Sequence, residues 1–203
     1  MAAGKVITGF SYPFVAVYAN NNGVISYTNG MQLARGVNVG ISAETGDVEN
    51  FYADNVIAES AGGLFTGGEV TLTVDGLKEA ARTLLMGLPT PTSVTVNGSS
   101  VDVYEYDDRQ NIPYVGIGFV VRYMENGIES YRPFVLPKVI FDEEGLDANT
   151  QEESIDFQTT ELTATILRDD SANHRWKRIG ADQDSEEKAV NVVKALLDIQ
   201  LSI

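Results

Sequence analysis

Short runs of alternating apolar and polar residues dominate the chain and predict β-strands. In residues 69–74, for example, valine and leucine alternate with threonine, which places the apolar side chains on one face of an extended chain. Asn-Gly pairs follow several of these runs and favour tight hairpin turns, because both residues tolerate positive φ. Strands are predicted over residues 14–19, 24–27, 33–43, 69–74, 94–96, 101–106, 114–124, 129–135, 139–141, 154–167 and 175–177.

Two segments follow helical spacing instead. The first lies between Asp75, a suitable N-cap, and Gly87, a suitable stop. The second covers about 185–199, where Asp184 and Glu187 have the spacing of a capping box. Each apolar helical stripe needs a surface to cover, and the sheets supply one. The expected fold class is α+β, mainly β: a β-sandwich or barrel with two short helices packed on it.

Residues 1–203 contain no stretch with the composition of a linker, so a single domain is expected. Its longest irregular loop is predicted at 44–68, which carries five acidic residues and no lysine or arginine. The same loop holds Phe51, Tyr52 and Phe65, and a group of large apolar side chains in a solvated loop is typical of an interaction site. These three aromatics are therefore expected to find a partner surface outside their own domain.

Composition removes several function classes. The chain has 29 acidic against 14 basic residues, one histidine and no cysteine. The net charge of −15 argues against a grip on nucleic acid or anionic lipid, and no apolar run is long enough to span a bilayer. Without cysteine there is no thiolate site. The sequence has no Gly-x-Ser-x-Gly motif that would supply a serine nucleophile to the lone His174. The glycine-rich stretch 62–68 lacks the lysine of a phosphate loop. We expect no enzyme, no metal and no cofactor.

The order of several segments resembles the major tail proteins of long-tailed phages that infect Gram-positive bacteria, the subunits of the tail tube. The most specific segment is Asn-Phe-Tyr-Ala-Asp-Asn-Val-Ile-Ala-Glu at 50–59, before a glycine-rich turn. Residues 114–119 and 131–134 are similar to the central hairpin of that family, and 175–177 to its tail before a short helix. The family often carries a C-terminal immunoglobulin-like domain, and this chain resembles the short form without one.

The resemblance implies a virion protein, assembled in the host cytoplasm, that forms hexameric rings stacked into a hollow tube for DNA. The implied partners are further copies of itself, the tape measure protein, the tail terminator, baseplate proteins and tail chaperones; DNA passes through the lumen without specific binding, and no membrane is involved. No catalytic residue carries over. Phe51, Tyr52 and Phe65 are expected in inter-subunit contacts, with acidic residues on the lumen and outer faces.

Because like charge opposes assembly, basic residues such as Arg35, Lys138 and Arg175 are expected nearer the contacts. Other classes of protein fit the same sequence. A tail terminator or head–tail joining protein of related fold would form single rings. A monomeric ligand-binding β-sandwich would show a defined pocket, and a glycosidase would need two carboxylates facing one another in a cleft.

Overall fold

The computed structural model describes residues 4–146, 148–150 and 157–200, and it confirms the α+β, mainly β class, with 54% strand and 10% helix. One antiparallel sheet of eight strands forms the body, in the order β2-β1-β9-β10-β11-β6-β3 with β12 paired to β10. Its strands are β1 (Val6–Asn21), β2 (Val24–Gln32), β3 (Gly36–Thr45), β6 (Phe65–Val74), β9 (Val115–Glu125), β10 (Ile128–Phe141), β11 (Thr160–Leu167) and β12 (Arg178–Ile179).

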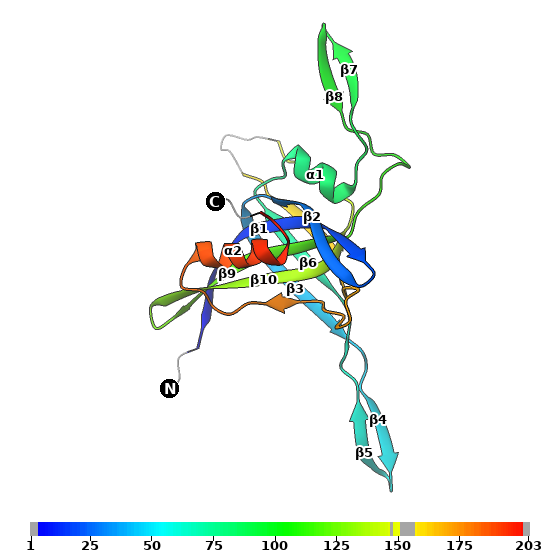
Figure 1. Cartoon of the computed structure of the whole chain (residues 1–203), viewed down its shortest axis with the longest axis vertical. Helices are drawn as coiled ribbons and strands as arrows, with labels where there is room; N and C mark the ends of the chain where they lie inside the picture. Colours follow the sequence, from blue (N-terminus) through cyan, green and yellow to red (C-terminus); the bar gives the residue numbers. More distant parts are fainter. Residues whose placement is uncertain (1–3, 147, 151–156, 201–203) are drawn as a thin grey trace.

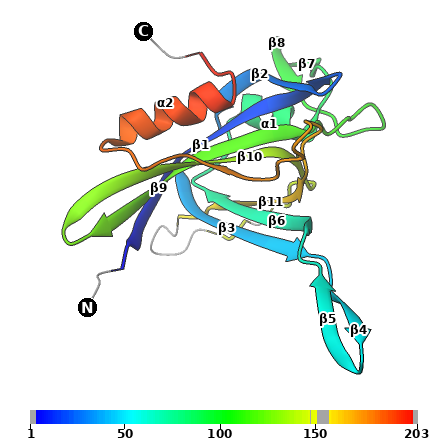
Figure 2. The same cartoon turned by 60° about the horizontal axis from the view of Figure 1, so that its bottom comes forward.

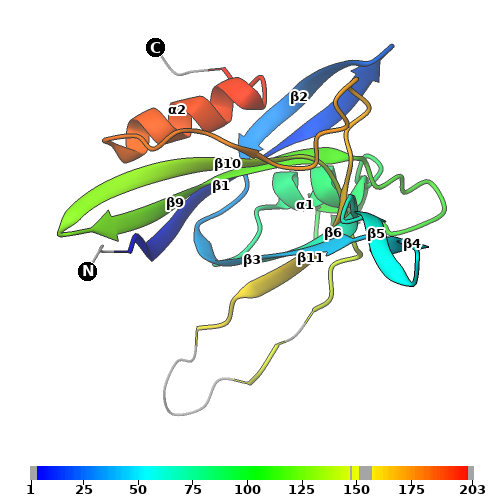
Figure 3. The ribbon, with the colours of Figure 1, turned by 90° about the horizontal axis from the view of Figure 1, so that it is seen from below.

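The sheet bends so that its two halves face each other (Figure 3). Strands β1, β9 and β10 form one layer, and β3, β6 and β11 form the other. The main core lies between these layers, where alternate residues of each strand meet. It includes Val15, Leu72, Ile117, Phe119, Leu136, Leu162 and Ile166, all almost completely buried.

Helix α2 (Glu186–Leu196) covers the outer face of the β1-β9-β10 layer (Figures 2 and 3). Its apolar residues Ala189 and Val193 pack in a second core with side chains from β1, β9 and β10. Strand β9 is therefore buried on both faces, which explains its continuous apolar run. Gly116 and Gly118 face the helix, and a Cβ at Gly118 would lie 2.5 Å from a Val193 methyl carbon. Glycine at these positions lets the helix lie close to the sheet.

Helix α1 (Glu79–Met86) closes one side of the main core with Leu85 and Met86. It begins later than predicted, and the expected N-cap role of Asp75 is wrong. Asp75 instead accepts hydrogen bonds from the backbone and guanidinium nitrogens of Arg35, which ties the ends of β6 and β3 together. The stop at Gly87 is confirmed, since this residue adopts φ 58°, in the left-handed region.

The second helix also differs at its ends from the predicted 185–199. The N-cap is Ser185, whose hydroxyl accepts from the backbone N–H of Lys188, so the predicted Asp184–Glu187 capping box is wrong. Asp184 pairs with the Lys188 ammonium at 2.7 Å instead. Serine and aspartate are equivalent as caps in sequence, and they are adjacent here, so the pattern alone cannot choose between them.

Two hairpins project from opposite ends of the body (Figure 1). One is formed by β4 (Glu49–Ala53) and β5 (Val56–Ala61), and the other by β7 (Thr92–Val96) and β8 (Ser99–Val103). The prediction of an irregular loop at 44–68 is therefore wrong, because β3 and β6 run into it and a hairpin occupies its centre. The predicted strand at 175–177 is displaced to β12, and the first residues of the predicted 154–167 strand, 154–156, lie outside the described residues.

An ion-pair cluster fixes the start of β1 and gives a pH-dependent contribution to stability. Asp182 accepts from the Arg132 guanidinium at 2.6 Å and from the Lys5 ammonium. These hydrogen bonds lower the pKa of Asp182 to about 2. A lowered folded-state pKa stabilises the fold above the unfolded pKa, near 4, and this contribution is lost as the pH falls towards 2.

We therefore expect Asp182→Asn to cost about 1 kcal/mol of unfolding free energy at pH 6, allowing for solvent screening. The cost should shrink to a few tenths at about pH 2, when the wild-type carboxylate is itself becoming protonated. Urea unfolding at both pH values measures it. The exposed Asp47→Asn is the control and should change nothing at either pH; an equal loss at both pH values for Asp182→Asn would contradict the account.

Candidate interaction site

The β4–β5 hairpin exposes large apolar side chains along its whole length. Phe51 is 66% exposed and Tyr52 61%, and Val56 and Ile57 on the opposing strand are similarly open. All eleven residues of the two strands are exposed. An isolated two-stranded hairpin is only marginally stable in water, and contiguous exposed apolar side chains mark interaction sites. The hairpin therefore has the character of a contact element, and no part of the chain that the structure describes covers it.

The tip of this hairpin is a tight turn at Asp54 and Asn55, both with positive φ. Positive φ at both central residues is typical of a type I′ turn, whose twist matches the twist of the flanking strands. Acidic residues surround the apolar ones: Glu49, Asp54 and Glu59 lie within the hairpin, and no basic residue occurs between 44 and 68. The hairpin thus combines an apolar surface with negative charge, so its partner surface should combine apolar residues with positive charge.

Phe65 does not belong to this exposed surface. Its side chain is only 7% exposed, and its ring stacks on Trp176 with centroids 4.3 Å apart. Phe65 begins β6 and belongs to the main core of its own chain. Little of its side chain is therefore exposed for contact with another copy. The structure thus separates the three aromatics that the sequence groups together: Phe51 and Tyr52 project into solvent, whereas Phe65 anchors the base of the segment.

The β7–β8 hairpin is also exposed throughout. Val94 lies opposite Val101, and the two-residue period places Val96 and Val103 on the same face. The other face is polar, where the Ser93 hydroxyl donates to Asp102 at 2.9 Å. Alternation predicts this hairpin from sequence, but nothing in the sequence indicates that it leaves the body and keeps its valines in solvent.

The main sheet also has two unpaired edges in the part of the chain that is described, along β2 and β3. Proteins usually protect such edges, because their free backbone groups can pair with a strand of another chain. Strand β3 is ten residues long and largely exposed. Its start contacts β1, where Phe10 lies against Gly36, but no described strand pairs with β3 on the side away from β6.

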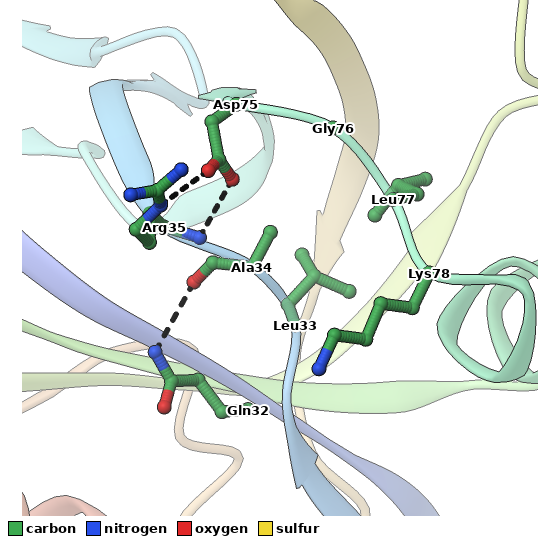
Figure 4. Close-up of a pocket in the computed structure, with 8 residues that line it drawn as sticks. All are labelled: Gln32, Leu33, Ala34, Arg35, Asp75, Gly76, Leu77 and Lys78. Atoms are coloured by element: carbon green, nitrogen blue, oxygen red, sulfur yellow. Dashed lines mark hydrogen bonds and ion pairs between the residues drawn. The ribbon is translucent and has the colours of Figure 1, made fainter.

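A crevice of about 450 Å³ lies where β2 leads into β3 and β6 leads towards α1 (Figure 4). Arg35 and Asp75 occupy one side of it and bind each other, while Lys78 extends along the other. The remaining lining includes the apolar side chains of Leu33 and Leu77 and the Gln32 side chain, whose amide donates to the Ala34 carbonyl at 3.3 Å. Its charged groups are paired or solvated, so it offers no nucleophile beside a base.

The loop around the single histidine places Ser171, Asp169 and His174 close together, yet their roles are structural. Asp169 is buried; burial alone would raise its pKa, but hydrogen bonds from Ser171 and Arg175 outweigh this effect and lower it. The Ser171 hydroxyl donates to Asp169 at 2.6 Å, and the Nδ1 atom of His174 lies 3.3 Å from the Asp169 backbone carbonyl oxygen. The serine is thus oriented towards the carboxylate, not towards a base, which is unlike a catalytic triad.

The three basic residues expected near contacts lie in different environments. Lys138 is largely buried, pairs with Asp170 at 2.8 Å and lies over the rings of Tyr18 and Tyr114. Arg175 binds Asp169. Both are therefore engaged within the chain, whereas Arg35 remains well exposed beside Asp75.

Among residues 4–146, 148–150 and 157–200, no group of three or more acidic or histidine side chains is arranged to hold a metal ion. The same residues include no helix long and apolar enough to cross a membrane. Comparison with protein-family models found no matching family, and comparison with curated proteins found no relative. The candidate site therefore rests on geometry: two exposed hairpins and two open sheet edges.

Proposed function

We propose that this chain is a structural, self-assembling virion protein, the subunit of a phage tail tube. The observation that supports it most is the placement of the two hairpins. They carry unpartnered apolar faces at opposite ends of the molecule (Figure 1), and neither face can cover the other within one chain. Contacts between different patches on identical copies are head-to-tail, and such contacts generate rings or open filaments.

The open edges of β2 and β3 support the same proposal, because pairing with neighbouring copies would remove both edges. The residues at 50–59 that carry the resemblance to tail tube proteins lie within the exposed β4–β5 hairpin. The net charge of −15 fits a conduit whose wall repels DNA phosphates, so that DNA passes without adhering.

The other classes of protein predict different assembly. A terminator or joining protein of related fold would close into single rings that do not stack. A ligand-binding β-sandwich would remain a monomer at all concentrations, since its function needs one copy. Electron microscopy of the concentrated protein separates the three outcomes: tubes support the proposal, whereas isolated rings or single particles favour the others.

A further inference from the structure

A second apolar surface lies away from the hairpins, in a groove of about 500 Å³ between β3 and the β1-β9-β10 layer. Val37, Val39 and Ile41 of β3 form one wall, and Phe10, Tyr123 and Phe134 contribute to the other. Phe10 lies directly against the backbone of Gly36, where a Cβ would come 2.1 Å from the ring. This close approach holds the two layers together at one end of the groove, and the other parts remain open.

The charge of the groove is opposite to that of the chain as a whole. Among the residues that the structure describes, no acidic side chain lines it, although the chain has 29 of them, and Lys177 is the one charged lining residue. The Arg122 guanidinium lies beside Gly9, which also lines the groove, but it is paired with Glu129 at 3.6 Å. Lys177 lies over the Trp176 ring and forms no ion pair with any described residue. The groove therefore offers apolar side chains together with the positive charge of Lys177, which no carboxylate among the described residues compensates.

We propose that this groove receives the β4–β5 hairpin of a second copy of the chain. The hairpin supplies the complementary features: exposed Phe51, Tyr52 and Ile57, with acidic residues and no base. A groove of this volume accommodates aromatic side chains, and the free edge of β3 can accept a strand alongside it. The hairpin of the same chain projects away from the body (Figure 2), so the occupant comes from another copy.

This inference rests on the proposed function, because it names the partner surface through which copies associate. It makes the contact head-to-tail: each chain contributes a hairpin to one neighbour and a groove to the other. Such a contact is not self-limiting at two copies, and it therefore continues until a ring closes or a filament grows.

Engineered cysteines test the contact directly, because the natural chain has none and gives no background. Two single-cysteine proteins are prepared: Ala53→Cys on the exposed hairpin strand β4, which leaves Phe51 and Tyr52 in place, and Val37→Cys in the groove, where Val37 is 54% exposed. They are mixed and treated with a short bis-maleimide. We expect a covalent dimer from the mixture and at least tenfold less from either protein alone.

A third protein, Val103→Cys on the β7–β8 hairpin, replaces Val37→Cys in the control mixture and should give at least tenfold less dimer. Adding Lys177→Glu to the groove protein should reduce the yield about tenfold, whereas Lys177→Arg should retain it. Circular dichroism and labelling with a monofunctional maleimide confirm that each variant is folded and its thiol accessible. No dimer above the control mixture would overturn the proposed docking site.

The cross-linking result distinguishes a failure of this contact from a failure of the proposed function. Tubes that form without the hairpin–groove dimer would leave the function standing and remove this contact. A hairpin–groove dimer from protein that never forms tubes would support the contact and count against the tail tube.

Discussion

Replacing both exposed aromatics of the β4–β5 hairpin, Phe51→Asp with Tyr52→Asp, should raise the concentration needed for assembly a hundredfold or more. Each aromatic side chain contributes about 1.5–3 kcal/mol when buried, and a carboxylate in its place would have to be desolvated in the contact. A loss of about 2.7 kcal/mol at one contact corresponds to a hundredfold change in its dissociation constant. Light scattering across a concentration series measures the onset of assembly.

The chain itself should remain folded, because both side chains project into solvent and contribute little to the core. The matched control is Ala148→Asp with Thr150→Asp, which adds the same two charges on an exposed segment of the body. It should shift the onset far less, since it changes net charge alone. Unchanged assembly by the hairpin variant would show that this hairpin makes no contact between copies.

The second large effect concerns the packing of helix α2 on strand β9. Gly118→Val should destabilise the fold by about 3 kcal/mol, because the added side chain would enter space held by Val193 and by Leu197, whose nearest methyl is 3.1 Å from a Cβ at this position. Helix α2 cannot retreat without exposing the second core. Chemical denaturation followed by circular dichroism gives the change in unfolding free energy.

Gly40→Val is the control for that measurement. Gly40 lies on the exposed strand β3, and a Cβ there meets nothing within 4 Å. The same substitution should therefore change the unfolding free energy by less than about 0.5 kcal/mol. Equal losses at the two glycines would contradict the assignment of the cost to the packing of α2, because valine is the better strand former at both positions.

Periodicity predicts the body of this protein well, because burial enforces it. The apolar run at 139–141 continues β10 past Pro137, as the alternation indicates, and both helical stripes cover cores. The helix ends were less predictable. Asp75 and Ser185 are both suitable N-cap residues, and tertiary contacts decide which of them caps a helix. Asp75 binds Arg35 instead, whereas Ser185 caps α2.

The candidate site was predictable only in part, because the sequence shows where aromatic residues occur but not which of them the fold buries. Phe51 and Phe65 lie in one glycine-rich segment, yet one is solvent-exposed and the other stacks on Trp176, more than a hundred residues away. The groove between β1 and β3 was not predicted at all. Its walls come from strands that meet only when the sheet bends, and no local pattern reports that bend.

Electron microscopy of negatively stained protein at increasing concentration tests the central claim most directly. The account predicts hollow tubes of uniform diameter with a regular axial repeat for the wild-type chain, and their loss in the Phe51→Asp, Tyr52→Asp variant. Wild-type protein that remains single particles at the highest concentration, or that closes into rings that never stack, would contradict it.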